Sequence, residues 1–388
     1  MASTLITILV LLVAIAAGLY QFYGVPLLTV IGYWRVVQPI GNTDCTTVPE
    51  LKACEKIVVH DPTGVLYLAC STPENRLKWI PAAGILNENP HEDYIATYDP
   101  STSKVTRLQI ENFNSGRGLS VHGMDVVPSD TNPSELYVYA VNHRLPLDGK
   151  DPKVVGADSV IEIFKTRVGS SSLAHVNTVE DSTVLTTPND VTGFSDGKSF
   201  FFTNDHGPHK TGTLKGLRNM FTSIASVGYC HVEHGCSIVV PKMHAANGIT
   251  KAPNGTIYVG SFFGAGISVF ERQEDNSLVL TDFISSNDIP LDNLSIDTEG
   301  AVWGAGIVKA NILSQYMKDP SVLSPTRAVK FTVNTGPGSF YGEKYRVETA
   351  FEDDGKIATG TTSVAHDALR KRLFIHGIMA PWLTICKT

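Results

Sequence analysis

The feature that most constrains the fold is a turn that recurs along the chain, each time followed by a run of β-forming residues. One copy is Asp61-Pro62-Thr63-Gly64, followed by Val65-Leu66-Tyr67-Leu68. Similar turns at 195–198, 253–255, 297–300 and 353–355 precede runs at 200–203, 256–259, 301–303 and 356–358, and a degenerate copy at 128–133 precedes 136–139. Turn residues followed by β-branched and aromatic residues are typical of β-hairpins.

The number and spacing of these turns predict an all-β fold, a six-bladed β-propeller. The six copies lie roughly 45 to 70 residues apart, a period typical of four-stranded blades around an axis. A β-sandwich is the alternative, but about 340 residues are too many for one sandwich. No linker-like segment interrupts residues 40–388. We therefore expect one propeller domain over residues 35–388, with short helical insertions at 210–226 and 310–319.

Residues 1–34 form a separate apolar segment, expected to be helical. No charged side chain occurs from Leu5 to Tyr33, and the first is Arg35. A signal peptide has an apolar core of about 7 to 15 residues and a small-residue cleavage site, for which Ala14-Ile15-Ala16 would serve. A spanning helix needs about 20 apolar residues, and this run is longer. The length favours a retained membrane anchor with a lumenal or extracellular domain; a cleaved signal and a secreted domain are the alternative.

The six cysteines indicate an oxidising compartment. An even count behind an export-like segment is typical of disulfide-bonded proteins. Two pairs flank short turns, and the remaining pair would join the start of the propeller to its end, where the first and last strands must meet. Cys54 and Cys70 could instead be free buried thiols. The pairings that fit are Cys45–Cys386, Cys54–Cys70 and Cys230–Cys236.

Several short segments place Asn, Asp or Glu beside an apolar strand, at intervals that match the repeat. The inner strands of a propeller all face the central channel, so residues far apart in sequence converge there. Carboxylate and amide oxygens without cysteine suit a hard cation such as calcium. Each segment taken singly is also compatible with an ordinary turn. The segments are 54–56, 188–190, 204–206, 246–248 and 291–293.

Two histidines are candidates for bases. His122 and His143 belong to the same repeat, on runs that could pair as neighbouring strands. Two imidazoles near a metal can take a proton from water at near-neutral pH, although either one alone is more ordinarily a hydrogen-bonded core residue. Five others could gather at the same mouth, namely His206, His209, His231, His234 and His244.

The charge and the motifs exclude several functions. The net charge is −7, the pI is about 5.9 and no long basic run occurs, so a nucleic-acid partner is not expected. The chain has no Walker loop, no Gly-x-Gly-x-x-Gly after a strand and no His-Glu-x-x-His.

Taken together, these segments resemble the serum paraoxonase/arylesterase family and, more distantly, the gluconolactonase and strictosidine-synthase-like propellers. The likeness runs from about Arg35 to Cys386 and rests on the order and spacing of short pieces. They are residues 37–39 before Cys45, His122-Gly123, 141–143, Asn189-Asp190 with 203–206, 246–249, 292–297 and Ile385-Cys386.

The resemblance implies a six-bladed propeller with calcium in its central tunnel. It assigns a catalytic histidine pair to His122 and His143, and it also implies a retained N-terminal anchor and the Cys45–Cys386 disulfide. The calcium ligands that it implies are Glu55, Asn189, Asn247, Asp292 and Asn293.

One position departs from the family pattern. In paraoxonases a second, structural calcium uses an acidic residue next to the glutamate and the Asp of the Asn-Asp pair, which here are Lys56 and Asp190. A lysine cannot ligate calcium, but its ammonium group can pair with Asp190 and occupy the space of the ion. We therefore expect one calcium ion and a Lys56–Asp190 ion pair.

The predicted function is calcium-dependent hydrolysis of small lactones or aryl esters, with calcium polarising the carbonyl group and the histidine pair activating water. A strictosidine-synthase-like or other propeller enzyme would keep the fold without needing these ligands. A non-catalytic binding propeller would show degenerate ligands, and only Lys56 departs. Asn254 and Asn293 lie in Asn-x-Ser/Thr sequons; Asn254, in a predicted turn, could carry a glycan.

Overall fold

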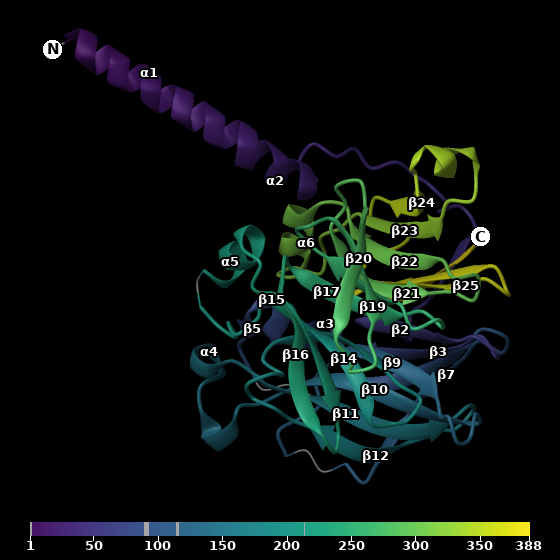
Figure 1. The fold of residues 1–388 in the computed structure, drawn as a ribbon. Coiled ribbons are helices and arrows are strands. Elements are labelled where there is room, and N and C mark those ends of the chain that lie inside the picture. Colours follow the sequence, from purple (N-terminus) through teal and green to yellow (C-terminus); the bar gives the residue numbers. More distant parts are fainter. Residues whose placement is uncertain (1, 89–92, 114–115, 213) are drawn as a thin grey trace.

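A computed structural model of the chain describes residues 2–88, 93–113, 116–212 and 214–388, and in that part six sheets of four or five strands surround a common axis (Figure 1). The innermost strands contact one another in a closed ring, and the last contacts the first. The fold is therefore the predicted six-bladed β-propeller. In ring order the inner strands are β2 (Lys56–His60), β9 (Val121–Pro128), β13 (Pro188–Gly193), β17 (Ala246–Lys251), β21 (Leu291–Ile296) and β25 (Ser363–Asp367).

Each blade continues outward with three more strands. The second strands are β3 (Val65–Cys70), β10 (Glu135–Arg144), β14 (Ser199–Asn204), β18 (Ile257–Ser261), β22 (Val302–Ile307) and β26 (Arg372–His376). The third strands are β6 (Tyr94–Asp99), β11 (Asp158–Arg167), β15 (Ala225–His231), β19 (Gly266–Arg272), β23 (Thr326–Val333) and β27 (Leu383–Lys387). The outer strands are β7 (Lys104–Arg107), β12 (Ser172–Val179), β16 (Gly235–Met243), β20 (Leu278–Ser285), β24 (Tyr345–Asp353) and β1 (Cys45–Val48). Strand β8 (Gln109–Glu111) extends the sheet of β12, and β4 (Trp79–Ile80) pairs with β5 (Ile85–Leu86).

The hydrophobic core lies between neighbouring blades. Along β14, Phe200 and Phe202 pack against Tyr139 of one neighbouring blade, while Phe201 belongs to the cluster of Ile257 in the other. Because successive side chains of a strand point to opposite faces, a run of three phenylalanines supplies both interfaces of its blade.

The ring closes through the two ends of the chain. Strand β1 pairs antiparallel with β27, so that Cys45 lies opposite Cys386, and the two are joined by a disulfide. The pairing covers what would otherwise be an exposed strand edge. All three predicted disulfides are present among the described residues, and the alternative of free thiols at Cys54 and Cys70 is wrong.

The turn predicted at 353–355 is not a hairpin. It follows the outer strand β24, and residues 356–358 form no strand. The Asp353 carboxylate accepts hydrogen bonds from the backbone N–H groups of Gly355 and Ile357, and this Asx-type turn ends the strand. The sixth turn lies instead at 368–371, between β25 and β26, where Lys371 adopts φ 53° without a glycine. The other predicted turns join inner and second strands.

The N-terminal segment is one apolar helix that projects from the propeller (Figure 1). It consists of α1 (Ala2–Leu19), a π-helical turn η1 (Tyr20–Gly24) and α2 (Val25–Val30). The stretch Ser3–Val30 is the candidate membrane span that the described residues contain. Each predicted insertion contains a shorter helix than expected, α5 (Lys215–Phe221) within 210–226 and α6 (Ala310–Tyr316) within 310–319, and residues 225–226 already belong to β15. The remaining short helices are α3 (Pro73–Arg76), α4 (Pro152–Val155), η2 (Pro81–Ala83), η3 (Leu147–Gly149) and η4 (Pro337–Tyr341).

Candidate active site

The inner strands β9, β13, β17 and β21 share one irregularity. In β13, Pro188 lies opposite Asn204 and Val191 opposite Phe202, so three steps on the inner strand match two on its neighbour. The same offset occurs in the other strands of this set. A β-bulge of this kind bends a strand and redirects its side chains. The residues at these bulges include five predicted site residues, His122, Asn189, Asn247, Asp292 and Asn293.

Glycines bring these bulges into direct contact with the next blade. A Cβ atom added to Gly248 would lie 2.6 Å from the Cα of Asn293, and one added to Gly123 would lie 2.4 Å from the Cα of Asp190. Neither position has room for a side chain, so the backbones of neighbouring blades approach closely there. This close approach gathers ligand candidates from different blades around the axis.

Two carboxyl groups are buried together at this point. Glu55, which is 1% exposed, accepts hydrogen bonds from Asn293 Nδ2 at 3.0 Å and from Thr362 Oγ1 at 2.6 Å. Burial raises the pKa of Glu55 to about 7. Burial, and next the charge of Glu55, raise the pKa of Asp292 well above its usual range. Both carboxylates would be stabilised as anions by a nearby positive charge.

Amide oxygens without partners accompany these carboxyl groups. In the described part of the chain, the Oδ1 atoms of Asn189, Asn247 and Asn293 are buried and accept no hydrogen bond. An unsatisfied buried acceptor costs about 1–3 kcal/mol, so such atoms ordinarily have a partner. Amide and carboxylate oxygens together form the donor set that calcium prefers. The residues therefore fit a calcium ion.

The two predicted catalytic histidines lie side by side. Their ring centroids are 5.3 Å apart in an edge-to-face arrangement. His122 Nε2 lies 3.3 Å from Asn189 Nδ2 and 3.7 Å from Glu55 Oε1. His143 Nδ1 is 2.8 Å from Ser159 Oγ. Burial lowers the pKa of His122 well below 6.5 and that of His143 to about 3, so both imidazoles are neutral at pH 7.

Sequence reasoning missed two other contributors. Arg76, 1% exposed, donates to the carbonyl oxygen of Val121, and Asp93 accepts from the N–H of the same residue. The two side chains also form an ion pair at 3.3 Å, so together they fix the backbone immediately before His122. No local motif marks Arg76. Asp205 belongs to segment 204–206, one of those that place Asn or Asp beside an apolar strand, but it is not among the predicted ligands. Its Oδ2 lies 3.4 Å from Asn189 Nδ2.

The departure at Lys56 is resolved as expected. Its ammonium group lies 2.5 Å from Asp190 Oδ2 and also donates to the carbonyl oxygen of Leu294. Both side chains are buried. The predicted Lys56–Asp190 ion pair is therefore confirmed.

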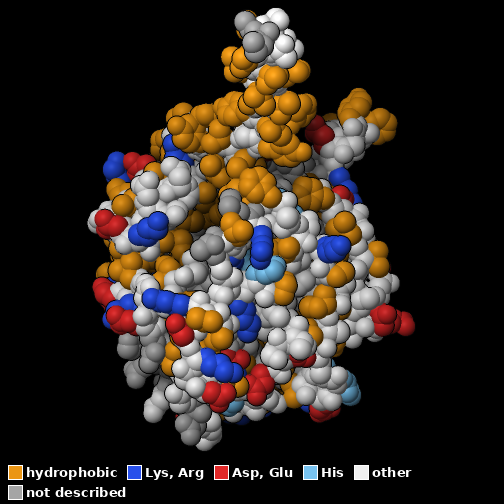
Figure 2. All heavy atoms as spheres, turned by 90° about the vertical axis from the view of Figure 1, so that its left-hand side faces the viewer, with side chains coloured by type: hydrophobic (Ala, Val, Ile, Leu, Met, Phe, Trp, Pro, Cys, Tyr) orange, Lys and Arg blue, Asp and Glu red, His pale blue; other side chains and the backbone are white. Residues whose placement is uncertain are grey.

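A cavity of about 740 Å³ opens onto this constellation, a size typical of small-molecule sites. Polar groups from the bulges form one part of its lining, and apolar side chains form much of the rest. Figure 2 shows hydrophobic side chains gathered beside a hollow on this face, below the projecting helix. The predicted site residues that line the cavity are Glu55, His122, Asn189, Asn247 and Asp292.

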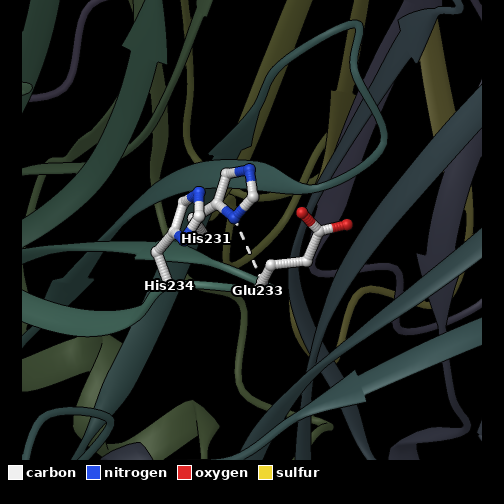
Figure 3. A group of neighbouring side chains, drawn as sticks. All are labelled: His231, Glu233 and His234. Carbon is white, nitrogen blue, oxygen red and sulfur yellow. Dashed lines mark hydrogen bonds between the residues drawn. The ribbon is translucent and has the colours of Figure 1, made fainter.

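Not every candidate converges on the cavity. His231 and His234 lie with Glu233 on the turn between β15 and β16, where the imidazoles stack at 4.3 Å (Figure 3). Backbone pairing puts this turn beside residue 198, in the turn between β13 and β14.

Residues 193–197 read Gly-Phe-Ser-Asp-Gly but form a strand-to-strand turn, not the strand-to-helix turn that exposes a nucleophilic serine.

Comparison with known proteins adds a family. The sequence model of the family described as Arylesterase matches residues 37–384. No curated protein sequence matches the chain. Among solved structures, the chain is similar to a luciferin-regenerating enzyme, with 13% identity and a TM-score of 0.49 over 91% of this chain and 95% of that one. It is also similar to a gluconolactonase from Xanthomonas campestris, with 12% identity and a TM-score of 0.47 over 91% and 97%.

These solved structures are too distant to carry an argument about activity. The family match, in contrast, spans nearly the whole propeller, from before β1 into β27, the two strands that pair to close the ring. On that match, the chain belongs to the arylesterase family.

Proposed function

We propose that the protein is a calcium-dependent hydrolase of lactones or aryl esters. The observation that carries the proposal is the set of buried amide oxygens without partners beside two buried carboxyl groups with raised pKa values. Family membership supports a hydrolase of the ester class. The proposed calcium ligands are Glu55, Asn189, Asn247, Asp292 and Asn293.

Bound calcium would polarise the carbonyl group of the substrate and stabilise the charge that develops on its oxygen. In the proposed reaction, His122 takes a proton from water that attacks the carbonyl carbon. The acyl C–O bond of the ester or lactone then breaks, and His122 returns the proton to the oxygen that leaves, so the products are a carboxylic acid and an alcohol. His143 lies edge-to-face with it and assists, while Ser159 holds the ring of His143. Neutral imidazoles are the required form of a base, and burial keeps both neutral at pH 7.

We also propose that the apolar helix is retained as an anchor, with the propeller on the lumenal or extracellular side. The length of Ser3–Val30 supports an anchor, and the disulfides support an oxidising compartment. Asn254 is exposed in its turn, as a glycosylation site requires, whereas Asn293 is 1% exposed. The glycan at Asn254 remains a prediction.

The test is hydrolysis of a panel of γ- and δ-lactones and phenyl acetate by the full-length protein in detergent, with calcium and after chelation. Asn247→Ala and His122→Gln should each lower kcat/KM by about 100-fold or more. The matched controls are Asn254→Gln and His234→Gln, which alter exposed residues of the same types outside the cavity. Chelation should abolish turnover, and calcium should restore it.

Turnover that survives complete chelation would overturn the calcium mechanism. If calcium instead raises the melting temperature but no panel member is hydrolysed, the ion has a structural role. A binding propeller would then be the better description.

A further inference from the structure

The end of the N-terminal segment, residues 25–35, is docked on the propeller, and we call it the foot. Helix α1 is exposed along nearly its whole length, whereas most residues of α2 are half-buried. After α2, the Arg35 guanidinium donates hydrogen bonds of 2.7 to 3.4 Å to the backbone carbonyl oxygens of Thr29, Asp288, Ile307 and Val308. One side chain thus ties the foot to the blade that contains β22.

Two further contacts fix the foot. The backbone N–H of Ala310, at the start of α6, donates to the carbonyl oxygen of Ile31 at 3.0 Å. Gly32 adopts φ 74°, and a Cβ atom there would lie 1.9 Å from the carbonyl oxygen of Val308. The backbones are therefore in direct contact, and no other residue fits at Gly32.

Anchoring does not require these contacts. The stretch Ser3–Val30 has 28 residues. At 1.5 Å per residue it is about 42 Å long, whereas a bilayer core is about 30 Å thick. The helix could span a membrane without α2, so the docking of the foot serves another purpose.

The position of Ile31 indicates that purpose. Ile31 lines the 740 Å³ cavity, together with apolar residues that include Phe262, Leu313, Met317 and Ile378. We propose that the foot forms one wall of the part of the cavity that receives the alkyl portion of the substrate, with Ile31 as a specificity-determining residue and Arg35 as its positioning residue. This inference rests on the proposed hydrolase function.

The first test measures docking alone. Ile31 and Ala310 share a backbone hydrogen bond, so cysteines at both positions would stand on adjoining backbones, as a disulfide requires. The native cysteines in the described part of the chain are all paired. We expect full-length protein carrying Ile31→Cys and Ala310→Cys to form this cross-link in membranes, detectable by peptide mass analysis. Adding Arg35→Ala should suppress it.

The second test measures selectivity. For full-length protein in one detergent, kcat/KM is determined for γ-valerolactone and γ-dodecalactone, and their ratio is compared between variants so that partitioning into micelles cancels. Loss of three methyl or methylene groups from a wall should lower the long-chain to short-chain ratio by at least about fivefold in Ile31→Ala, and Arg35→Ala should do the same. The control is Arg346→Ala, because Arg346 is an exposed arginine outside the cavity.

The outcomes separate the two proposals. An unchanged ratio in both variants, or no cross-link, overturns the role of the foot even if lactones are hydrolysed. If the wild type hydrolyses no ester or lactone, the proposed function fails, and binding of 2-nonylcyclopentanone replaces turnover as the readout. Weaker binding by Ile31→Ala than by wild type would then support the wall, and equal binding would refute it.

Discussion

Removing one partner of the Lys56–Asp190 ion pair should be more damaging than removing both. The Asp190 side chain is 0% exposed and Lys56 is 5% exposed. In Lys56→Met the Asp190 carboxylate keeps backbone donors such as the N–H of Ile249 but loses its counter-charge. In Asp190→Asn the ammonium group keeps the carbonyl oxygen of Leu294. Breaking a buried pair in this way costs about 3–5 kcal/mol, because an uncompensated charge stays buried.

The double variant should be much less destabilised than the sum of the single ones. Two neutral side chains leave no charge to desolvate, so we expect a cost of about 2 kcal/mol or less and a coupling energy of at least about 3 kcal/mol. The assay is denaturant unfolding of the full-length protein in detergent, followed by tryptophan fluorescence. Lys387→Met, at the exposed pair with Asp44, should cost less than about 1 kcal/mol. The reasoning would be refuted if the losses in free energy of unfolding of the two single variants added up in the double variant, or if Lys56→Met did not lower the free energy of unfolding.

Three further predictions concern the frame of the site. Replacing Cys45 and Cys386 by alanine should destabilise the fold by up to about 5 kcal/mol, more than twice the effect of replacing Cys230 and Cys236. The reason is that the first disulfide closes a loop of 341 residues and the second a loop of 6. Equal losses of stability in calorimetry would contradict this prediction. Burial lowers the pKa of His376 to about 4, from an unfolded value near 6.5. The neutral ring therefore supplies stability above pH 6.5 that is lost as the pH falls toward 4, and the loss is about 3 kcal/mol in all. His376→Gln should flatten the plot of unfolding free energy against pH over this range. Gly248→Ala places a methyl group 2.6 Å from the Cα of Asn293 and should lower the free energy of unfolding by about 1–3 kcal/mol. It should also weaken the stabilisation by calcium. A variant with the melting temperatures of the wild type, with and without calcium, would show that the bulges can separate.

Much of the fold could be predicted because it repeats. Turn residues and β-forming runs are local, so they report the blade boundaries without knowledge of the packing. The exception shows the limit of the pattern. The turn at 368–371 has no glycine, and Lys371 adopts the positive φ instead. Asp353 and Gly355 match the same turn motif, but they form the turn that ends β24 and do not join two strands of a hairpin.

The site divides in a similar way. Short segments and the family resemblance suggested the bulge residues, since each lies beside an apolar strand. Arg76 could not be found in this manner, because its role depends on reaching the backbone of Val121 in the next blade. Nor could the docking of Ile31, whose residue type suits a membrane anchor equally well. Both depend on contacts between segments far apart in the sequence, for which a single chain carries no local signal.

The closure of the ring by β1 and β27 has a consequence for how the protein is made. Cys45 and Cys386 are separated by 341 positions. At roughly 5–20 residues per second, the ribosome needs about 20 to 70 s to synthesise what lies between them. Cys45 therefore lacks its native partner, and β1 lacks β27, until synthesis is nearly finished. Until then a chaperone or oxidoreductase in the same compartment would find one unpaired strand edge and one reactive thiol, side by side at the start of the propeller.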